Sequence, residues 1–169
     1  MHNVEIRDIA DFSHWLPTIS SWFYSEWREL YGSQTQGDVE RRIGGWLQRD
    51  AIPTALVAVV DGQVIGTVAL KEKELDQFTG SPWLAGLFVV PQYRNAGVGA
   101  QLLRAAENKA RALGLRKLYL YTPRSRRYYD TLGWRLQQEV DLASGSVAVM
   151  EKILVPHSLF QQPPQGRRG

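Results

Sequence analysis

WLAGLFVVPQYRNAGVG, the stretch from Trp83 to Gly99, decides how this chain folds. Its first half, residues 83–90, has the β-branched and aromatic character of a buried strand. Its second half, from Arg94 onward, is a glycine-containing turn, and apolar residues then recur at helical spacing until Gly114 supplies a stop. The stretch therefore predicts a strand, a tight turn and a helix in succession.

The turn at the start of this helix predicts an anion-binding site. Unpaired backbone N–H groups point outward from a helix N-terminus, at the positive end of the helix dipole. Gly97 and Gly99 place no side chain in the way, so the backbone can approach an anion closely. We therefore expect a ligand that carries phosphate.

Two common phosphate-binding motifs do not fit this turn. A Walker loop needs Lys followed by Ser or Thr after its last glycine, whereas Gly99 is followed by Ala100 and Gln101. A dinucleotide fingerprint needs a third glycine where this chain has Leu102, and an acidic residue after the next strand, which ends without one. Neither a P-loop NTPase nor a dinucleotide-binding domain is therefore expected.

Three further features accompany the turn. The segment Val89–Gly99 follows the pattern Val-x-Pro, an aromatic residue, then (Gln or Arg)-x-x-Gly-x-(Gly or Ala), and Pro91 ends the strand. A second apolar strand, residues 115–121, follows the helix. The segment YYDTLGW, residues 128–134, carries a tyrosine four residues before a glycine. With these features, residues 54–153 resemble the GCN5-related N-acetyltransferase (GNAT) superfamily.

The resemblance implies a single-domain fold of the mixed α/β class, with a central sheet that is mostly antiparallel. In that family the strands corresponding to 83–90 and 115–121 run parallel and splay apart, and acetyl-CoA enters the gap as co-substrate. The backbone of the first strand contacts the acetyl-pantetheine arm, and the turn holds the diphosphate. The implied cofactor-binding residues are Leu87, Phe88, Val89, Arg94, Asn95, Ala96, Gly97, Val98, Gly99 and Ala100.

By the same resemblance, Tyr129 is the catalytic general acid that protonates the departing CoA thiolate. The backbone N–H of Val89 is expected to polarise the thioester carbonyl. The alternative for Tyr129 is a half-buried aromatic residue whose hydroxyl meets solvent, and Tyr128 is expected to pack in the core. The chain departs from the family's common residues at Thr122 and Ser125, with a proline between them.

A base is needed to prepare the acceptor, because an alkyl ammonium is only about one-thousandth neutral at pH 7. The catalytic candidates are Glu26, on a Trp-rich helical segment, and Asp76, in the loop before the motif strand, with a solvated role as the alternative for each. Glu72 and Glu74 lie in the same loop, and the four carboxylates together predict a site that attracts a cationic amine.

Aromatic residues offer walls for this acceptor site. The candidates are Trp22, Trp27 and Trp83, although an aromatic residue at helical spacing is usually part of the core.

The remaining segments follow the family's element order. A first strand is expected at residues 4–7, an amphipathic helical region at 12–30 interrupted near Pro17, and a second helix capped by Asp38. Asp61-Gly62 predicts a two-residue hairpin between strands at 55–60 and 64–70, and two closing strands at 135–140 and 147–153 flank a turn at 141–146. We expect one domain over residues 1–155 and a disordered tail over 156–169.

Composition restricts the class of protein. The chain contains no cysteine, which excludes disulfides and thiolate metal sites, and no metal is expected. It has no apolar run of about 18 residues and no signal-like N-terminus, so we expect no membrane association and a cytoplasmic location. The net charge is only +3, and the arginines at 124, 126 and 127 are expected to border the adenosine phosphates or to form a solvated helix face. No nucleic acid partner is therefore expected.

The leading hypothesis is an N-acetyltransferase that moves the acetyl group of acetyl-CoA directly to a primary amine of a small molecule or peptide. The alternative is a non-catalytic GNAT-like module that binds CoA or an acyl-CoA as a sensor. A third hypothesis is a nucleic-acid-binding domain that uses residues 124–129. The sequence does not identify the acceptor, and a homodimer stays open because dimers are common in the family.

Overall fold

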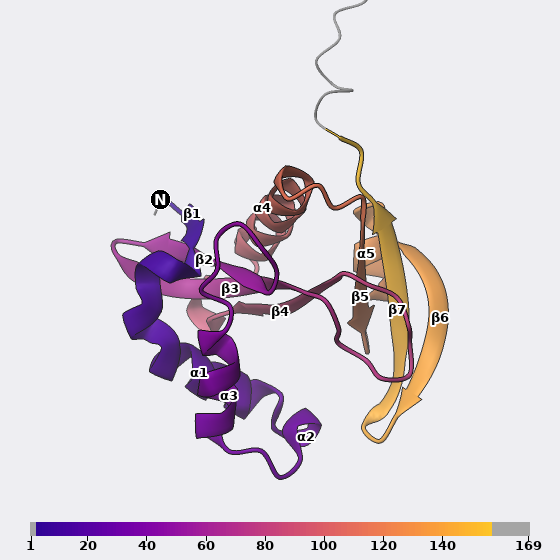
Figure 1. The fold of residues 1–169 in the computed structure, drawn as a ribbon, viewed down its shortest axis with the longest axis horizontal. Helices are drawn as coiled ribbons and strands as arrows, with labels where there is room; N and C mark the ends of the chain where they lie inside the picture. The colour runs from indigo at the N-terminus through magenta and orange to yellow at the C-terminus, as the bar shows by residue number, and fades with distance from the viewer. Residues whose placement is uncertain (1–2, 157–169) are drawn as a thin grey trace, which may run out of the picture.

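A twisted sheet organises residues 3–156, which are the residues that this computed structural model describes (Figure 1). Within them the strand order is β1-β2-β3-β4-β5-β7-β6, and every neighbouring pair is antiparallel except β4 and β5. The strands are β1 (Glu5–Asp8), β2 (Thr54–Val60), β3 (Gln63–Lys71), β4 (Trp83–Val89), β5 (Lys117–Thr122), β6 (Arg135–Leu142) and β7 (Gly145–Ile153). The prediction of a mixed α/β fold with a mostly antiparallel sheet is confirmed.

The helices cover both faces of this sheet. They are η1 (Ile9–Trp15), α1 (Leu16–Glu26), α2 (Arg28–Tyr31), α3 (Gln36–Gly44), η2 (Pro91–Tyr93), α4 (Val98–Ala112) and α5 (Arg126–Thr131). In Figure 1 α4 lies above β2–β4, and α1 and α3 lie below. The alternation of β2 explains this arrangement: Leu56 and Ala58 pack in the core cluster with α4, whereas Val57 and Val59 pack with α1 and α3.

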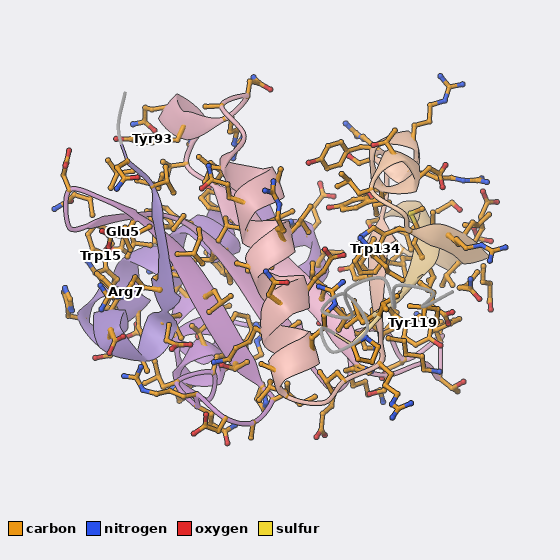
Figure 2. All side chains as sticks on the ribbon, turned by 90° about the horizontal axis from the view of Figure 1, so that it is seen from above. Glu5, Arg7, Trp15, Tyr93, Tyr119 and Trp134 are labelled. Carbon is orange, nitrogen blue, oxygen red and sulfur yellow. The ribbon has the colours of Figure 1, made fainter. Side chains whose placement is uncertain are left out.

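Strands β4 and β5 form the parallel pair, and they meet at one point. Trp83 pairs with Tyr119, and beyond that pair the two strands diverge, so that β5, β7 and β6 stand apart from β1–β4 (Figure 1). In Figure 2, Tyr119 and Trp134 lie with this second group of strands, while α4 lies across the first. The expected splay between the two strands is therefore present.

Two hairpins illustrate where local sequence decides the structure and where it does not. Asp61 and Gly62 have φ angles of 49° and 75°, as a two-residue type I′ turn requires, so that prediction is confirmed. The hairpin predicted around residues 141–146 is present, but its turn is shorter than predicted, because Asp141 pairs with Ser146 and Leu142 with Gly145. The ladder of β6 and β7 continues to a two-residue loop, and Gly145 accepts a φ of 125° beside it.

The interruption predicted near Pro17 is present as a change of helix type, because the 3-10 helix η1 ends at Trp15 and α1 begins at Leu16. Pro17 is in the first turn of α1, where a proline lacks no hydrogen bond that the helix needs and its fixed φ suits the helix. The helical region breaks a second time at Trp27, whose φ of −117° and ψ of 28° separate α1 from α2.

Thr35, not Asp38, is the N-cap of α3. The Thr35 hydroxyl accepts a hydrogen bond from the Asp38 N–H at 3.1 Å, and the Asp38 carboxylate accepts one from the Thr35 N–H at 2.8 Å. This reciprocal capping box places Asp38 at the third helical position, so the prediction that it caps the helix is wrong by three residues.

We expect Thr35→Ala to lower the free energy of unfolding by about 1 kcal/mol, because an alanine leaves the Asp38 N–H without its acceptor. Urea denaturation followed by circular dichroism measures this change. Thr35→Ser is the matched control, since it keeps the hydroxyl. Equal losses for the two variants would contradict the capping role.

No helix within residues 3–156 is both long enough and apolar enough to cross a membrane. Apart from Pro156, the predicted tail at 156–169 lies outside the described residues.

Candidate active site

The turn that precedes α4, residues 94–100, is the predicted anion-binding site, and we call it the anion seat. Its N-cap, Gly97, has a φ of 83°, and Asn95 has a φ of 62°. No side chain caps the helix and no acidic residue lies in its first turn, so the first backbone N–H groups of α4 have no partner within the helix. A Cβ atom built on Gly97 or Gly99 would meet nothing within 4 Å. The space in front of these N–H groups is therefore open to a ligand.

Strand β4 carries a bulge at the place where it leaves β5. Thr67 of β3 opposes Phe88 and Ala69 opposes Ala85, so β4 has one more residue than β3 in this interval. Gly86 adopts a φ of 60° there, and the buried Thr67 hydroxyl donates a hydrogen bond to its carbonyl at 2.7 Å. The bulge bends β4 away from β5 and fixes the direction of the backbone that follows.

Beyond the bulge, the backbone of Val89 faces the divergent side of β4. The Val90 N–H donates to the Ile65 carbonyl at 2.9 Å, and antiparallel pairs alternate, so Val89 turns its N–H and carbonyl away from β3. In agreement, the Val89 carbonyl accepts a hydrogen bond from Arg94 Nε at 2.8 Å. The same alternation turns the backbone of Phe88 toward β3. Three residues of this strand are predicted to contact the acetyl-pantetheine arm. Of these, Leu87 and Val89 face the divergent side of β4 with their backbone groups, and Phe88 does not.

A cavity of about 600 Å³ opens where β4 and β5 diverge. Part of its lining comes from Gly86 and Leu87 of β4, from the end of β5, and from Tyr129 of α5. The rest of the lining comes from α1, α2, α3, the segment between α2 and α3, and the loop that follows β3, and its polar residues are Glu26, Tyr31, Gln34, Arg42, Lys71 and Glu74. The cavity therefore joins the splayed strands to the helical layer.

The two carboxylates predicted as catalytic candidates lie in different surroundings. Glu26, the last residue of α1, lines the cavity, and its carboxylate is 4.0 Å from Arg94 Nη2. The Asp76 side chain is 88% exposed, is paired with Lys73 at 2.9 Å and is outside the cavity lining. Glu74, not Asp76 or Glu72, is the loop carboxylate in the cavity wall.

Tyr129 lines the cavity from α5 and is half-buried. Its ring packs edge-on against Trp134, with the ring centroids 6.3 Å apart. Burial, with a smaller contribution from Tyr128, raises the pKa of Tyr129 to about 12. The phenol therefore keeps its proton at neutral pH.

Tyr128 is 45% exposed, so the prediction that it packs in the core is wrong. Successive residues of a helix do not share a face, and α5 turns Tyr129 rather than Tyr128 toward Trp134.

The residues that differ from the family pattern close the end of β5. The Thr122 hydroxyl, which is buried, accepts a hydrogen bond from the Ser125 N–H at 3.0 Å across Pro123. All three residues line the cavity. The Thr122 hydroxyl oxygen thus accepts a hydrogen bond that stabilises the turn leading into α5.

The three tryptophans have three different roles. Trp27 lines the cavity, as predicted. Trp22 is not in the lining, and its ring stacks on that of Phe88, with the centroids 5.4 Å apart. Trp83 is completely buried against Phe78 and Tyr119, so a wall role is wrong for it, because it begins β4 inside the core.

Sequence reasoning missed Tyr31, Arg42, Lys71 and Tyr121, all of which line the cavity. For Arg42 a signal was present. It follows Val39 by three residues and precedes Trp46 by four, so it belongs to the apolar stripe with which α3 packs on the core.

Comparison with known proteins places this site in context. The family model described as "Acetyltransferase (GNAT) family" matches residues 16–134. The amino-acid acetyltransferase of Pseudomonas syringae pv. syringae is 35% identical over 101 residues, which are 60% of this chain and 22% of that protein. The amino-acid acetyltransferase of Mannheimia succiniciproducens is 30% identical over 113 residues, 67% of this chain and 25% of that protein. The chain thus spans about a quarter or less of the length of these curated relatives.

Solved structures share the fold. An aminoglycoside 6'-N-acetyltransferase complexed with coenzyme A superposes with a TM-score of 0.71 at 17% identity, over 90% of this chain and 98% of that chain. A GNAT-family acetyltransferase from Streptococcus pneumoniae superposes with a TM-score of 0.66 at 19% identity, over 90% of this chain and all of that chain.

Proposed function

Because the chain belongs to the acetyltransferase (GNAT) family, we propose that it transfers the acetyl group of acetyl-CoA directly to a primary amine of a small molecule or peptide. The observation that carries the proposal is the cavity between β4 and β5, which has the Tyr129 phenol in its wall. Arg94 connects this cavity with the anion seat, since it bonds the Val89 carbonyl and approaches Glu26. An amino acid is among the amines to test, because the relatives bear the name amino-acid acetyltransferase.

The anion seat fits the diphosphate of CoA. Seven residues, Arg94 to Ala100, surround the uncapped N-terminus of α4, and a diphosphate satisfies backbone donors that have no partner within the helix. The outward-facing backbone of Leu87 and Val89 suits the amides of the pantetheine arm, which lies along a strand edge as a further strand would. No metal has a role in this proposal.

The chemistry needs a neutral amine, a polarised carbonyl and a proton for the thiolate. We assign removal of the amine proton to Glu26, acting through water, because it is a carboxylate in the cavity wall and Asp76 is not. The Val89 N–H polarises the thioester carbonyl as the amine nitrogen attacks it. As the C–S bond breaks, the Tyr129 hydroxyl gives its proton to the CoA sulfur, and the N-acetyl product and CoA leave.

A single substitution tests the anion seat. We expect Gly99→Asp to weaken CoA binding at least about tenfold, because a carboxylate then lies among the N–H groups that would bind the diphosphate. Calorimetric titration of CoA measures the change. Gly37→Asp is the matched control, since Gly37 and Gly99 are both second residues of a helix, where an aspartate is well tolerated. Equal CoA affinity in both variants would place the diphosphate elsewhere.

Thiol release from acetyl-CoA with a panel of primary amines tests the reaction itself. Turnover that requires an amine supports the proposal. Tight CoA binding without turnover on any amine would favour the sensor alternative, and absence of CoA binding would reject both.

A further inference from the structure

The part of the cavity wall formed by the helices, by Lys71 and by the loop that follows β3 contains charged side chains of both signs. Glu74 pairs with Lys71 at 2.7 Å, and both side chains are about four-fifths buried. Glu26 is 4.0 Å from Arg94. Arg42 is the remaining charged residue of the lining, and it forms no ion pair with any residue between positions 3 and 156. The lining thus carries two carboxylates and two cations, and Arg42 is its one charged residue without an ion-pair partner in the described part of the chain.

The Arg42 guanidinium is held in place but lacks acceptors. It lies over the ring of Tyr31, 5.0 Å from the ring centroid. Its Nη2 is buried and has no hydrogen-bond partner in the described part of the chain. A buried charged donor without an acceptor is costly, and a carboxylate is the group whose two oxygens best match a guanidinium.

The polar neighbours of Arg42 do not cancel its charge. Burial raises the pKa of Tyr31 and raises that of Tyr121 to about 12, so both phenols are neutral at physiological pH. The charge of Glu74 acts on both tyrosines, but Lys71 already holds that carboxylate. The two hydroxyls add neutral hydrogen-bonding groups to the same cavity.

We propose that Arg42 binds a carboxylate of the acceptor, so that the acceptors of this protein are amines that also carry a carboxylate, as amino acids do. The inference rests on the proposed acetyl transfer and adds to it the residue that selects the acceptor. The acceptor then lies with its amine toward Leu87 and Tyr129 and its carboxylate toward α3, within one cavity of about 600 Å³. That volume suits a small molecule rather than a folded protein surface.

Binding of product-like probes tests this subsite without any need for catalysis. The probes are the N-acetyl forms of glycine, leucine, glutamate and lysine, each compared with its carboxamide, titrated by calorimetry into protein saturated with CoA. We expect at least one N-acetyl acid to bind roughly 10- to 100-fold more tightly than its amide, as for a charged hydrogen bond. Arg42→Gln should remove this preference, and Arg42→Lys should retain part of it.

Arg41→Gln is the matched control. Arg41 is the preceding residue of α3, its side chain is 75% exposed, and it pairs with Asp38 outside the cavity. The control removes the same charge from the same helix and should keep the preference for the acid. Thermal unfolding of each variant shows whether it is folded. If Arg42→Gln is unstable, the comparison of acid with amide on the unaltered chain still shows whether the cavity prefers a carboxylate.

The outcomes separate this inference from the proposed function. Equal binding of acids and amides, a preference that survives in Arg42→Gln, or no measurable binding of any acid would overturn the carboxylate subsite. Rapid acetylation of amines that lack a carboxylate, at the rate of amino acids, would also overturn it while leaving acetyl transfer intact. A preference for acids that depends on Arg42, combined with no thiol release for any amine, would instead overturn only the acetyl transfer.

Discussion

Tyr129→Phe should lower kcat for acetyl transfer by about 100-fold, with little change in CoA affinity. The substitution removes one oxygen and leaves the ring that packs against Trp134. The loss falls on kcat because the phenol acts on the sulfur only as the C–S bond breaks. Steady-state kinetics with a competent amine and calorimetric titration of CoA measure the two quantities.

Tyr128→Phe is the control, since Tyr128 is the neighbouring tyrosine on α5, is exposed and does not line the cavity. It should retain the full rate. Since burial raises the pKa of Tyr129 to about 12, the phenol stays protonated across the neutral and mildly alkaline range. Loss of the Tyr129 proton should therefore not reduce the rate until the pH approaches that value. An unchanged kcat in Tyr129→Phe would remove the phenol from the mechanism.

The cofactor side of the candidate site could be predicted from sequence because it depends on local backbone. A strand followed by a glycine turn and a helix places N–H groups at the helix start whatever the rest of the chain does, and Gly97 takes the positive φ that the turn needs. The prediction that β4 diverges from β5 depended on the family resemblance, since no local pattern in either strand specifies this divergence. The bulge at Gly86 was not foreseen, although a glycine inside a strand pattern is a signal for one.

The acceptor side could not be predicted in the same way, because it is assembled from segments far apart in sequence. The sequence offers no way to distinguish Glu74 from Asp76, because each carboxylate has a lysine three residues before it. In the structure the ion pair of Lys71 with Glu74 holds one carboxylate in the cavity wall, and the pair of Lys73 with Asp76 holds the other in solvent. Arg42 belongs to α3, and the position of α3 depends on its packing against α1 and β2, which the local sequence does not specify.

A second group of charges, away from the cavity wall, holds α5 against the rest of the molecule. Lys152 of β7 pairs with Glu107 of α4 at 2.6 Å and donates a hydrogen bond to the Leu132 carbonyl at 2.7 Å. Leu132 is the C-cap of α5 and follows Tyr129 by less than one helical turn. The Glu107 side chain is only 10% exposed and that of Lys152 only 21%. One ammonium thus joins three elements around the helix that carries the candidate acid.

Lys152→Met should lower the free energy of unfolding by about 3–5 kcal/mol, because it leaves the buried Glu107 carboxylate without a counter-charge. The double variant Glu107→Leu with Lys152→Met should recover most of that loss, since an apolar pair of similar volume replaces the ion pair. Lys73→Met is the exposed control and should change stability by no more than about 0.5 kcal/mol. Urea denaturation measures all three. The double variant should still show a reduced kcat, because the Leu132 carbonyl has lost its donor; full activity there would mean that α5 holds Tyr129 without this anchor.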